Sequence, residues 1–86
     1  MRIPASIVIR GRTYAVRIVR MKKDTAGEAK QKDRVIRIQR GMDRDLQEET
    51  FLHEILHLVD WRMKEKQVNK IARDLYKVIT ENKLWR

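Results

Sequence analysis

The chain has 86 residues, with 42% hydrophobic and 38% charged side chains and a net charge of +9. This length corresponds to one small domain, and the apolar content argues against a disordered chain. The sequence contains no cysteine, which excludes disulfides, and no uncharged run that is long enough to cross a membrane.

Alternation of apolar and polar residues with a period of two predicts short strands in the first forty positions. The predicted strands cover residues 6–10, 13–20, 27–31 and 34–40. Gly11 and Arg12 form the expected two-residue connection of the first hairpin. Because apolar and basic residues alternate along these strands, we expect a small antiparallel sheet with one apolar and one basic face.

The hydrophobic period then changes to that of a helix and predicts two helices. The first covers residues 45–62 and begins with Asp45 and Glu48, which fit a capping box. The second covers residues 65–82, and the short connection predicts an antiparallel helix pair packed on the sheet. Residues 1–86 are therefore expected to form a single α+β domain, a sheet of three to four strands followed by two packed helices.

The surplus of positive charge lies entirely in the strand region. Residues 1–40 carry twelve Lys and Arg against three Asp and Glu, whereas residues 41–86 carry nine of each. This asymmetry is typical of a protein with an acidic partner or a nucleic-acid ligand. Basic side chains on solvated strands produce the same count, and we favour that interpretation.

Residues 53–57 read His-Glu-Ile-Leu-His and fall in the middle of the first predicted helix. Since positions i and i+4 lie on the same side of a helix, His53 and His57 can converge on one zinc ion through their Nε2 atoms. Glu54 projects about 100° further round the helix, where it can take a proton from a zinc-activated water. The sequence therefore predicts a metal site with one acid–base residue beside it.

Glu49 and Asp60 lie on the same side of this helix as the two histidines. Their carboxylates would orient the ring N–H groups of the metal-binding imidazoles. The alternative interpretation is that all these residues are polar side chains on the exposed face of an amphipathic helix. We favour the metal site, because the motif falls on a predicted helix, as this chemistry requires.

The stretch 48–57 resembles the catalytic helix of small zincin-type metallopeptidases. The likeness extends over nearly the whole chain to short phage- or prophage-type proteins related to the ImmA/IrrE and SprT-like groups. It includes the Arg-Ile-Pro start at residues 2–4, the Gly11 hairpin, Gly27 and the final helix. The resemblance implies a minimal zincin-like fold, zinc peptidase activity, a sheet edge that receives an extended peptide, and a third zinc ligand on the last helix.

Two carboxylates are candidates for that third ligand. In gluzincin-type relatives the ligand is a Glu on the next helix, and Glu65 matches it, since it lies on the flank of the second helix that faces the first. A carboxylate at the start of a helix is also favoured by the helix dipole without any metal. Asp60, one turn beyond His57, is the other candidate. Alternatively, its carboxylate accepts a hydrogen bond from the ring N–H of a histidine that binds the metal.

Two aromatic residues are further candidates for the site. Tyr76 lies on the same flank as Glu65, so its hydroxyl would reach an oxyanion, although a core ring with a wet hydroxyl is the more common role. Trp61 is adjacent to Glu54 on the helical wheel, and it would either line a substrate pocket or cap a thin core.

These features together predict a zinc-dependent metallopeptidase with Zn²⁺ as cofactor and Glu54 as general base. We expect a peptide or protein substrate, acidic or associated with nucleic acid, to lie along an exposed edge strand at residues 34–40. The alternatives are a zinc-stabilised binding module without catalysis and, less favoured, a basic nucleic-acid-binding domain. The N-terminus has no apolar region typical of a signal peptide, so we expect a cytoplasmic protein, of a kind that phages also encode.

Overall fold

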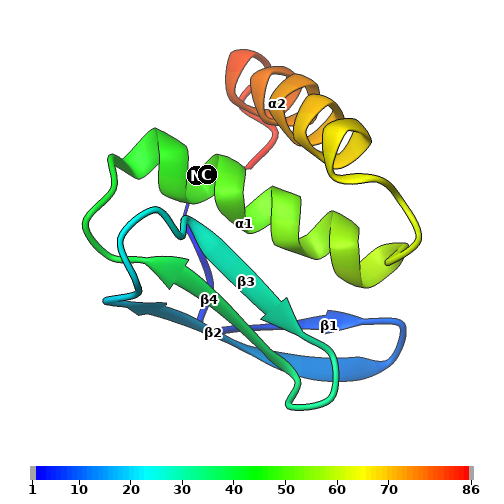
Figure 1. Cartoon of the computed structure of the whole chain (residues 1–86). Coiled ribbons are helices and arrows are strands. Elements are labelled where there is room, and N and C mark those ends of the chain that lie inside the picture. Colours follow the sequence, from blue (N-terminus) through cyan, green and yellow to red (C-terminus); the bar gives the residue numbers. More distant parts are fainter. Residues whose placement is uncertain (1, 86) are drawn as a thin grey trace.

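The computed structural model of the chain describes residues 2–85 and has the predicted α+β fold (Figure 1). The strands are β1 (Ser6–Ile9), β2 (Arg12–Val19), β3 (Gly27–Lys30) and β4 (Val35–Gln39). The helices α1 (Arg44–Val59) and α2 (Glu65–Glu81) follow the strands. Within the described part of the chain, no helix is long and apolar enough to span a bilayer.

The strands form one mixed sheet in the order β1-β2-β4-β3. The β1–β2 and β3–β4 pairs are antiparallel, as predicted, but β2 and β4 are parallel neighbours. Their register sets Val16 beside Ile36 and Ile18 beside Ile38. Because β4 is paired on both sides, residues 34–40 offer no free edge, and the expectation that a substrate lies along them is wrong. The exposed edge on this side of the sheet belongs to β3.

The first hairpin turns at Arg10 and Gly11, one residue earlier than predicted. Both residues have positive φ, at 52° and 77° respectively. Two consecutive residues in this region are typical of the type I′ turn, whose twist matches that of the flanking strands. Arg12 is consequently the first residue of β2, paired with Ile9.

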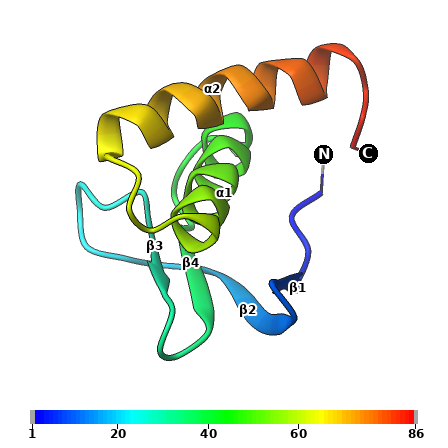
Figure 2. The same ribbon diagram turned by 90° about the vertical axis from the view of Figure 1, so that its right-hand side faces the viewer.

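The molecule has three layers, namely the sheet, α1 and α2. Figures 1 and 2 show α1 lying across one face of the sheet and α2 crossing over α1 on the side away from the strands. Since α2 packs against α1 and against no strand of the described chain, the prediction that both helices pack on the sheet holds only for α1. Val68 and Ala72 are the buried residues of α2.

The hydrophobic core lies between α1 and the inner face of the sheet. Its buried residues come from three strands and one helix: Ile9, Tyr14, Val16, Ile36, Ile38, Phe51 and Leu58. α1 is covered by the sheet on one side and by α2 on another, so three of its polar side chains are buried as well, those of Glu48, Thr50 and Glu54. The predicted polar face of this helix is therefore largely enclosed by protein.

Candidate metal centre

The helix α1 carries the His-Glu-Ile-Leu-His motif in its second half. It begins at Arg44 with Asp43 as N-cap and ends at Val59, so it starts and stops slightly before the predicted 45–62 range. His53 and His57 are one helical turn apart, and their side chains are half-buried, at 15% and 25% exposure. The two Nε2 atoms are 3.1 Å apart, so the imidazoles converge instead of pointing into solvent.

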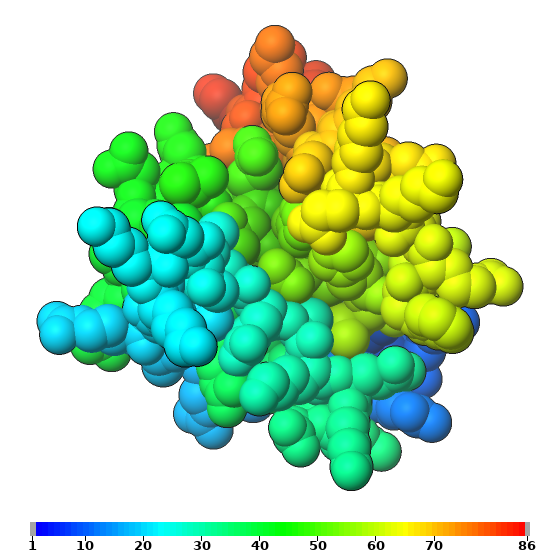
Figure 3. Space-filling view, in the orientation of Figure 1, coloured from blue at the N-terminus to red at the C-terminus, as the bar shows by residue number. Residues whose placement is uncertain are grey.

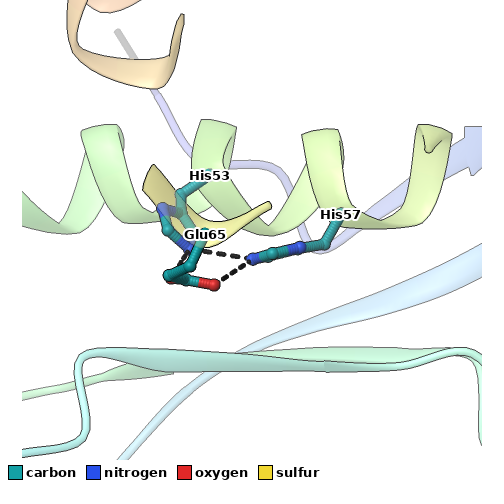
Figure 4. A group of neighbouring side chains, drawn as sticks. All are labelled: His53, His57 and Glu65. Carbon is teal, nitrogen blue, oxygen red and sulfur yellow. Dashed lines mark hydrogen bonds and ion pairs between the residues drawn. The ribbon is translucent and has the colours of Figure 1, made fainter. Parts of the chain in front are cut away.

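Glu65, the first residue of α2, brings a carboxylate to both histidines (Figure 4). Its Oε1 lies 2.8 Å from Nε2 of His53, and its Oε2 lies 2.9 Å from Nε2 of His57. The short connection after α1 reverses the chain, and this reversal brings the start of α2 over the motif. Glu65 therefore lies beside both histidines, where a third ligand is expected, and its binding to a metal stays a prediction.

The three side chains fit a zinc ion by donor type and by spacing. Two imidazole nitrogens and one carboxylate form a donor set typical of catalytic zinc sites, which keep a further position for water or substrate. Two nitrogens bound tetrahedrally at about 2.0–2.1 Å from one ion would be about 3.3 Å apart. The ligand atoms of His53, His57 and Glu65 all lie within 4.8 Å of one another, so the group could hold a metal.

Glu54 is buried beside this group, with only 6% of its surface exposed. Burial raises the pKa of its carboxyl to about 7, and the negative charges of Glu65 and Glu28 add to the effect. A carboxyl with a pKa near neutrality can both accept and donate a proton, as a general acid–base group must. A divalent cation at the neighbouring site would oppose the rise, because its positive charge favours the carboxylate form.

A cavity of about 390 Å³ opens next to the three converging side chains. Its walls come from α1, from the segment before β3 and from the first turns of α2. Figure 3 shows this face, with α1 in green recessed between the cyan segment and the yellow start of α2. The lining residues are Asp24, Thr25, Ala26, Gly27, Leu46, Glu49, Thr50, His53, Glu54, Glu65 and Asn69. The candidate metal centre and the buried Glu54 therefore share one cavity at the N-terminal end of β3.

Several residues of this cavity are not candidates in the sequence reading, above all Gly27. A Cβ on Gly27 would lie 2.6 Å from Cγ2 of Thr50 and 3.3 Å from Oε2 of Glu54. The strand β3 thus approaches α1 as closely as a residue without a side chain allows. A glycine inside a strand pattern indicates such a close approach, and this signal could have identified Gly27.

The two predicted supporting carboxylates lie in different places. Glu49 lines the cavity together with His53, one helical turn away. Asp60 follows the last residue of α1 and accepts hydrogen bonds from the backbone N–H and from Nε of Arg62, at 3.1 and 3.4 Å. The carboxylate of Asp60 is thus engaged by Arg62 and not by a histidine, and it is not among the three converging ligands.

The two aromatic candidates lie away from the cavity. The hydroxyl of Tyr76 donates hydrogen bonds to Oε1 of Glu48 at 2.6 Å and to Oδ1 of Asp45 at 3.1 Å. A helical wheel puts Tyr76 on the flank of Glu65, but the two residues are about 16 Å apart along the helix axis. The suggested oxyanion contact is therefore wrong.

Trp61 lies beyond the end of α1, so its place on a helical wheel next to Glu54 has no structural meaning. Its side chain is 71% exposed and lines a separate surface pocket with Arg10, Leu58 and other residues. Trp61 neither caps the core nor contributes to the candidate metal centre.

No protein-family model, no curated protein and no solved structure matches the chain. The resemblance to small zincins therefore stays a prediction that rests on the sequence motif.

Proposed function

We propose that the protein is a zinc-dependent metallopeptidase. The observation that carries the proposal is the convergence of His53, His57 and Glu65 from two helices at a cavity that also contains the buried Glu54. Two of these residues are separated by only one helical turn, but Glu65 reaches the group through the packing of α2 on α1. Two surface histidines without a shared role would not be expected to converge with Glu65 at a cavity that contains a buried carboxylate.

The chain's own residues supply the acid–base part of the reaction. When bound, a zinc ion contributes Lewis-acid chemistry, since it eases deprotonation of the attacking water and polarises the scissile carbonyl. Glu54 accepts the proton of that water and later delivers it to the departing amine nitrogen. Burial raises the pKa of Glu54 to about 7 in the metal-free protein, and a bound zinc ion would lower it again, which favours the carboxylate form that accepts the proton of the water.

The free edge of β3 offers a place for the substrate backbone. β3 pairs with β4 on one side only, so the other side of its backbone is available for hydrogen bonds to an extended peptide. The start of β3 also lines the cavity, which brings a bound peptide past Glu54. We therefore propose an extended peptide or protein segment as the substrate.

The decisive experiment compares zinc content and peptide hydrolysis in the wild type and in Glu54→Gln. We expect both proteins to bind one zinc per chain and the variant to lose at least a hundredfold in hydrolysis rate, since general base catalysis contributes about 10²–10⁴-fold. His53→Ala should lose both zinc and activity. Glu81→Gln, a change at the far end of α2, is the matched control and should behave like the wild type.

Hydrolysis by Glu54→Gln at the wild-type rate would refute the catalytic assignment of this residue. A wild type that binds zinc but cleaves no member of a diverse peptide pool would favour the second candidate, a zinc-stabilised binding module. One observation supports that candidate: among the described helices and strands, α2 contacts only α1, so a metal shared between the two helices would add a second link between α2 and the rest of the fold.

A further inference from the structure

The cavity beside the metal centre has a charge opposite to that of the whole protein. Lys and Arg make up 21 of the 86 residues, and the net charge is +9. None of the residues that line the cavity is Lys or Arg, whereas Asp24, Glu49, Glu54 and Glu65 all contribute to its walls. A cleft lined by one sign of charge focuses the electric field, so a side chain inside this recess meets the negative charge of its walls although the whole protein is positive.

Two of these four carboxylates, those of Glu49 and Asp24, have no role in the proposed reaction. Glu65 is the third metal ligand and Glu54 is the general base, which leaves Glu49 and Asp24. Glu49 projects from α1 one helical turn before His53, and Asp24 lies in the segment before β3. They stand on two different walls of the same cavity, so a group that enters it meets a carboxylate from either side.

A second feature of the cavity, the buried carboxylate of Glu54, also indicates a ligand site and does not depend on the charge of the other walls. The side chain of Glu54 lines it while being more than nine-tenths buried, and it makes no hydrogen bond or ion pair with any residue from 2 to 85. Its oxygens therefore have room for a partner from outside the chain. Gly27 lines the adjoining wall, and its lack of a side chain lets β3 pack against Thr50 right beside Glu54.

From this arrangement we infer that the cavity is the subsite for a cationic side chain, Lys or Arg, next to the scissile bond of the substrate. This inference rests on the proposed peptidase function and names its specificity. The aliphatic stem of a lysine would run past Leu46 and the methyl group of Thr50, and its ammonium would lie between Glu49 and Asp24. The expectation of acidic substrates came from the charge of the strands, whereas the cavity favours the opposite charge.

The test uses two small zinc-binding probes that differ only in a terminal amino group, Nα-acetyl-lysine hydroxamate and Nα-acetyl-norleucine hydroxamate. Calorimetry with the zinc-loaded full chain should give about five- to tenfold tighter binding of the lysine probe, the range of one or two partly exposed ion pairs. In Glu49→Gln the ratio should fall toward one, and in Glu49→Lys it should invert. Glu81→Gln is the control and should keep the wild-type ratio.

Asp24→Asn provides a second variant, because Asp24 is exposed in a loop and its loss cannot unfold the helix. We expect it to lower the ratio by about two- to threefold. In parallel, cleavage sites in a peptide pool should carry Lys or Arg on one side of the cut in the wild type and lose this enrichment in Glu49→Gln.

The outcomes separate the two proposals. Equal affinity of the zinc-loaded wild type for both hydroxamates overturns the cationic subsite, even if peptides are cut. A lysine preference that depends on Glu49, found without any peptide cleavage, supports the binding of a cationic side chain in this cavity and overturns the peptidase function. Failure of the chain to bind zinc, measured directly, overturns both.

Discussion

Gly27 in β3 and Thr50 in α1 are packed so closely that no side chain fits between them. A Cβ on Gly27 would come within 2.6 Å of Cγ2 of Thr50 and within 3.0 Å of the carbonyl oxygen of Arg37. This contact fixes the height of the sheet edge above the helix that carries Glu54. The width of the cavity therefore depends on Gly27, although this residue has no side chain that could bind a metal or transfer a proton.

Replacing Gly27 by Ala should lower the free energy of unfolding by about 1–3 kcal/mol, because overpacking forces the strand or the helix to shift. Thr50→Ser removes the methyl group that the new Cβ would meet. In denaturant titrations, the double variant Gly27→Ala/Thr50→Ser should therefore be less destabilised than the sum of the two single changes. Strict additivity would show that Thr50 does not limit the approach of β3.

The raised pKa of Glu54 predicts how the metal-free protein responds to pH. Between the ordinary value of 4.5 and about 7, the folded state keeps a proton that the unfolded state releases, so stability falls as pH rises through this window. The loss from this group is about 3 kcal/mol. Glu54→Gln cannot titrate, so the variant should become more stable relative to wild type as pH rises from 4.5 to 7.

Chelator-treated proteins and urea unfolding at several pH values check this expectation. Glu81→Gln is the matched control, since its carboxylate is exposed at the end of α2. A stability difference between wild type and Glu54→Gln that stays constant from pH 4.5 to 7 would contradict the burial argument.

Zinc should stabilise the fold through the link between the two helices. A ligand that binds only the folded state adds about 2.7 kcal/mol at a concentration of 100 times its Kd. For a domain of this size, such a gain raises Tm by roughly 10–20 °C. Glu65→Ala should lose most of this zinc-dependent rise in a thermal melt, whereas Glu81→Ala should retain it. An equal rise in both variants would exclude Glu65 as a ligand.

Local sequence patterns were sufficient for the elements and for the core of the candidate site. The period-two and period-3.6 patterns located all described strands and helices to within a few residues. The i, i+4 spacing of His53 and His57 requires only that the segment be helical. Glu65 was a candidate because the resemblance to gluzincins implies a Glu on the next helix and because Glu65 lies on the flank of that helix that faces the first.

What the patterns could not supply is the position of residues along and between elements. A helical wheel discards axial distance, so it grouped Tyr76 with Glu65 although about 16 Å separate them. A strand pattern does not specify its neighbours, so the parallel pairing of β2 with β4 was missed, and with it the true free edge. Both errors concern tertiary arrangement, which alternation and periodicity do not encode.

The observed partners of Tyr76 lead to a different prediction. Its hydroxyl donates to Glu48, a buried residue with 3% exposure, at the point where α2 passes over the start of α1. Because a hydrogen bond to a buried charged group contributes about 1.5–3 kcal/mol, Tyr76→Phe should cost that amount in the free energy of unfolding. Tyr14→Phe is the control, since the Tyr14 hydroxyl has no hydrogen-bond partner within residues 2–85.

Burial and the two carboxylates also raise the pKa of Tyr76 above its ordinary value. The folded state therefore disfavours the phenolate, and wild-type stability should decline as pH rises past about 10, the ordinary value of a tyrosine. Tyr76→Phe should lack this part of the decline. Parallel alkaline unfolding curves of the two proteins would contradict the assignment.

The two tryptophans should respond in opposite ways to truncation. The ring of Trp85 packs on the fully buried Phe51, with centroids 5.7 Å apart and planes tilted by 59°. This contact brings the segment after α2 back onto the core, across the helix that carries the metal motif. Trp85→Ala should therefore cost about 2–4 kcal/mol, somewhat less than the loss of a fully enclosed aromatic ring.

Trp61→Ala removes a side chain that is 71% exposed, so it should change stability by no more than about 0.5 kcal/mol. Chemical denaturation of both variants, followed by circular dichroism because each lacks one fluorophore, measures the difference directly. A larger loss of unfolding free energy for Trp61→Ala than for Trp85→Ala would mean that Trp61, and not Trp85, packs on the core. In that case, the contact of Trp85 with Phe51 would not be what holds α2, and with it Glu65, above the histidines.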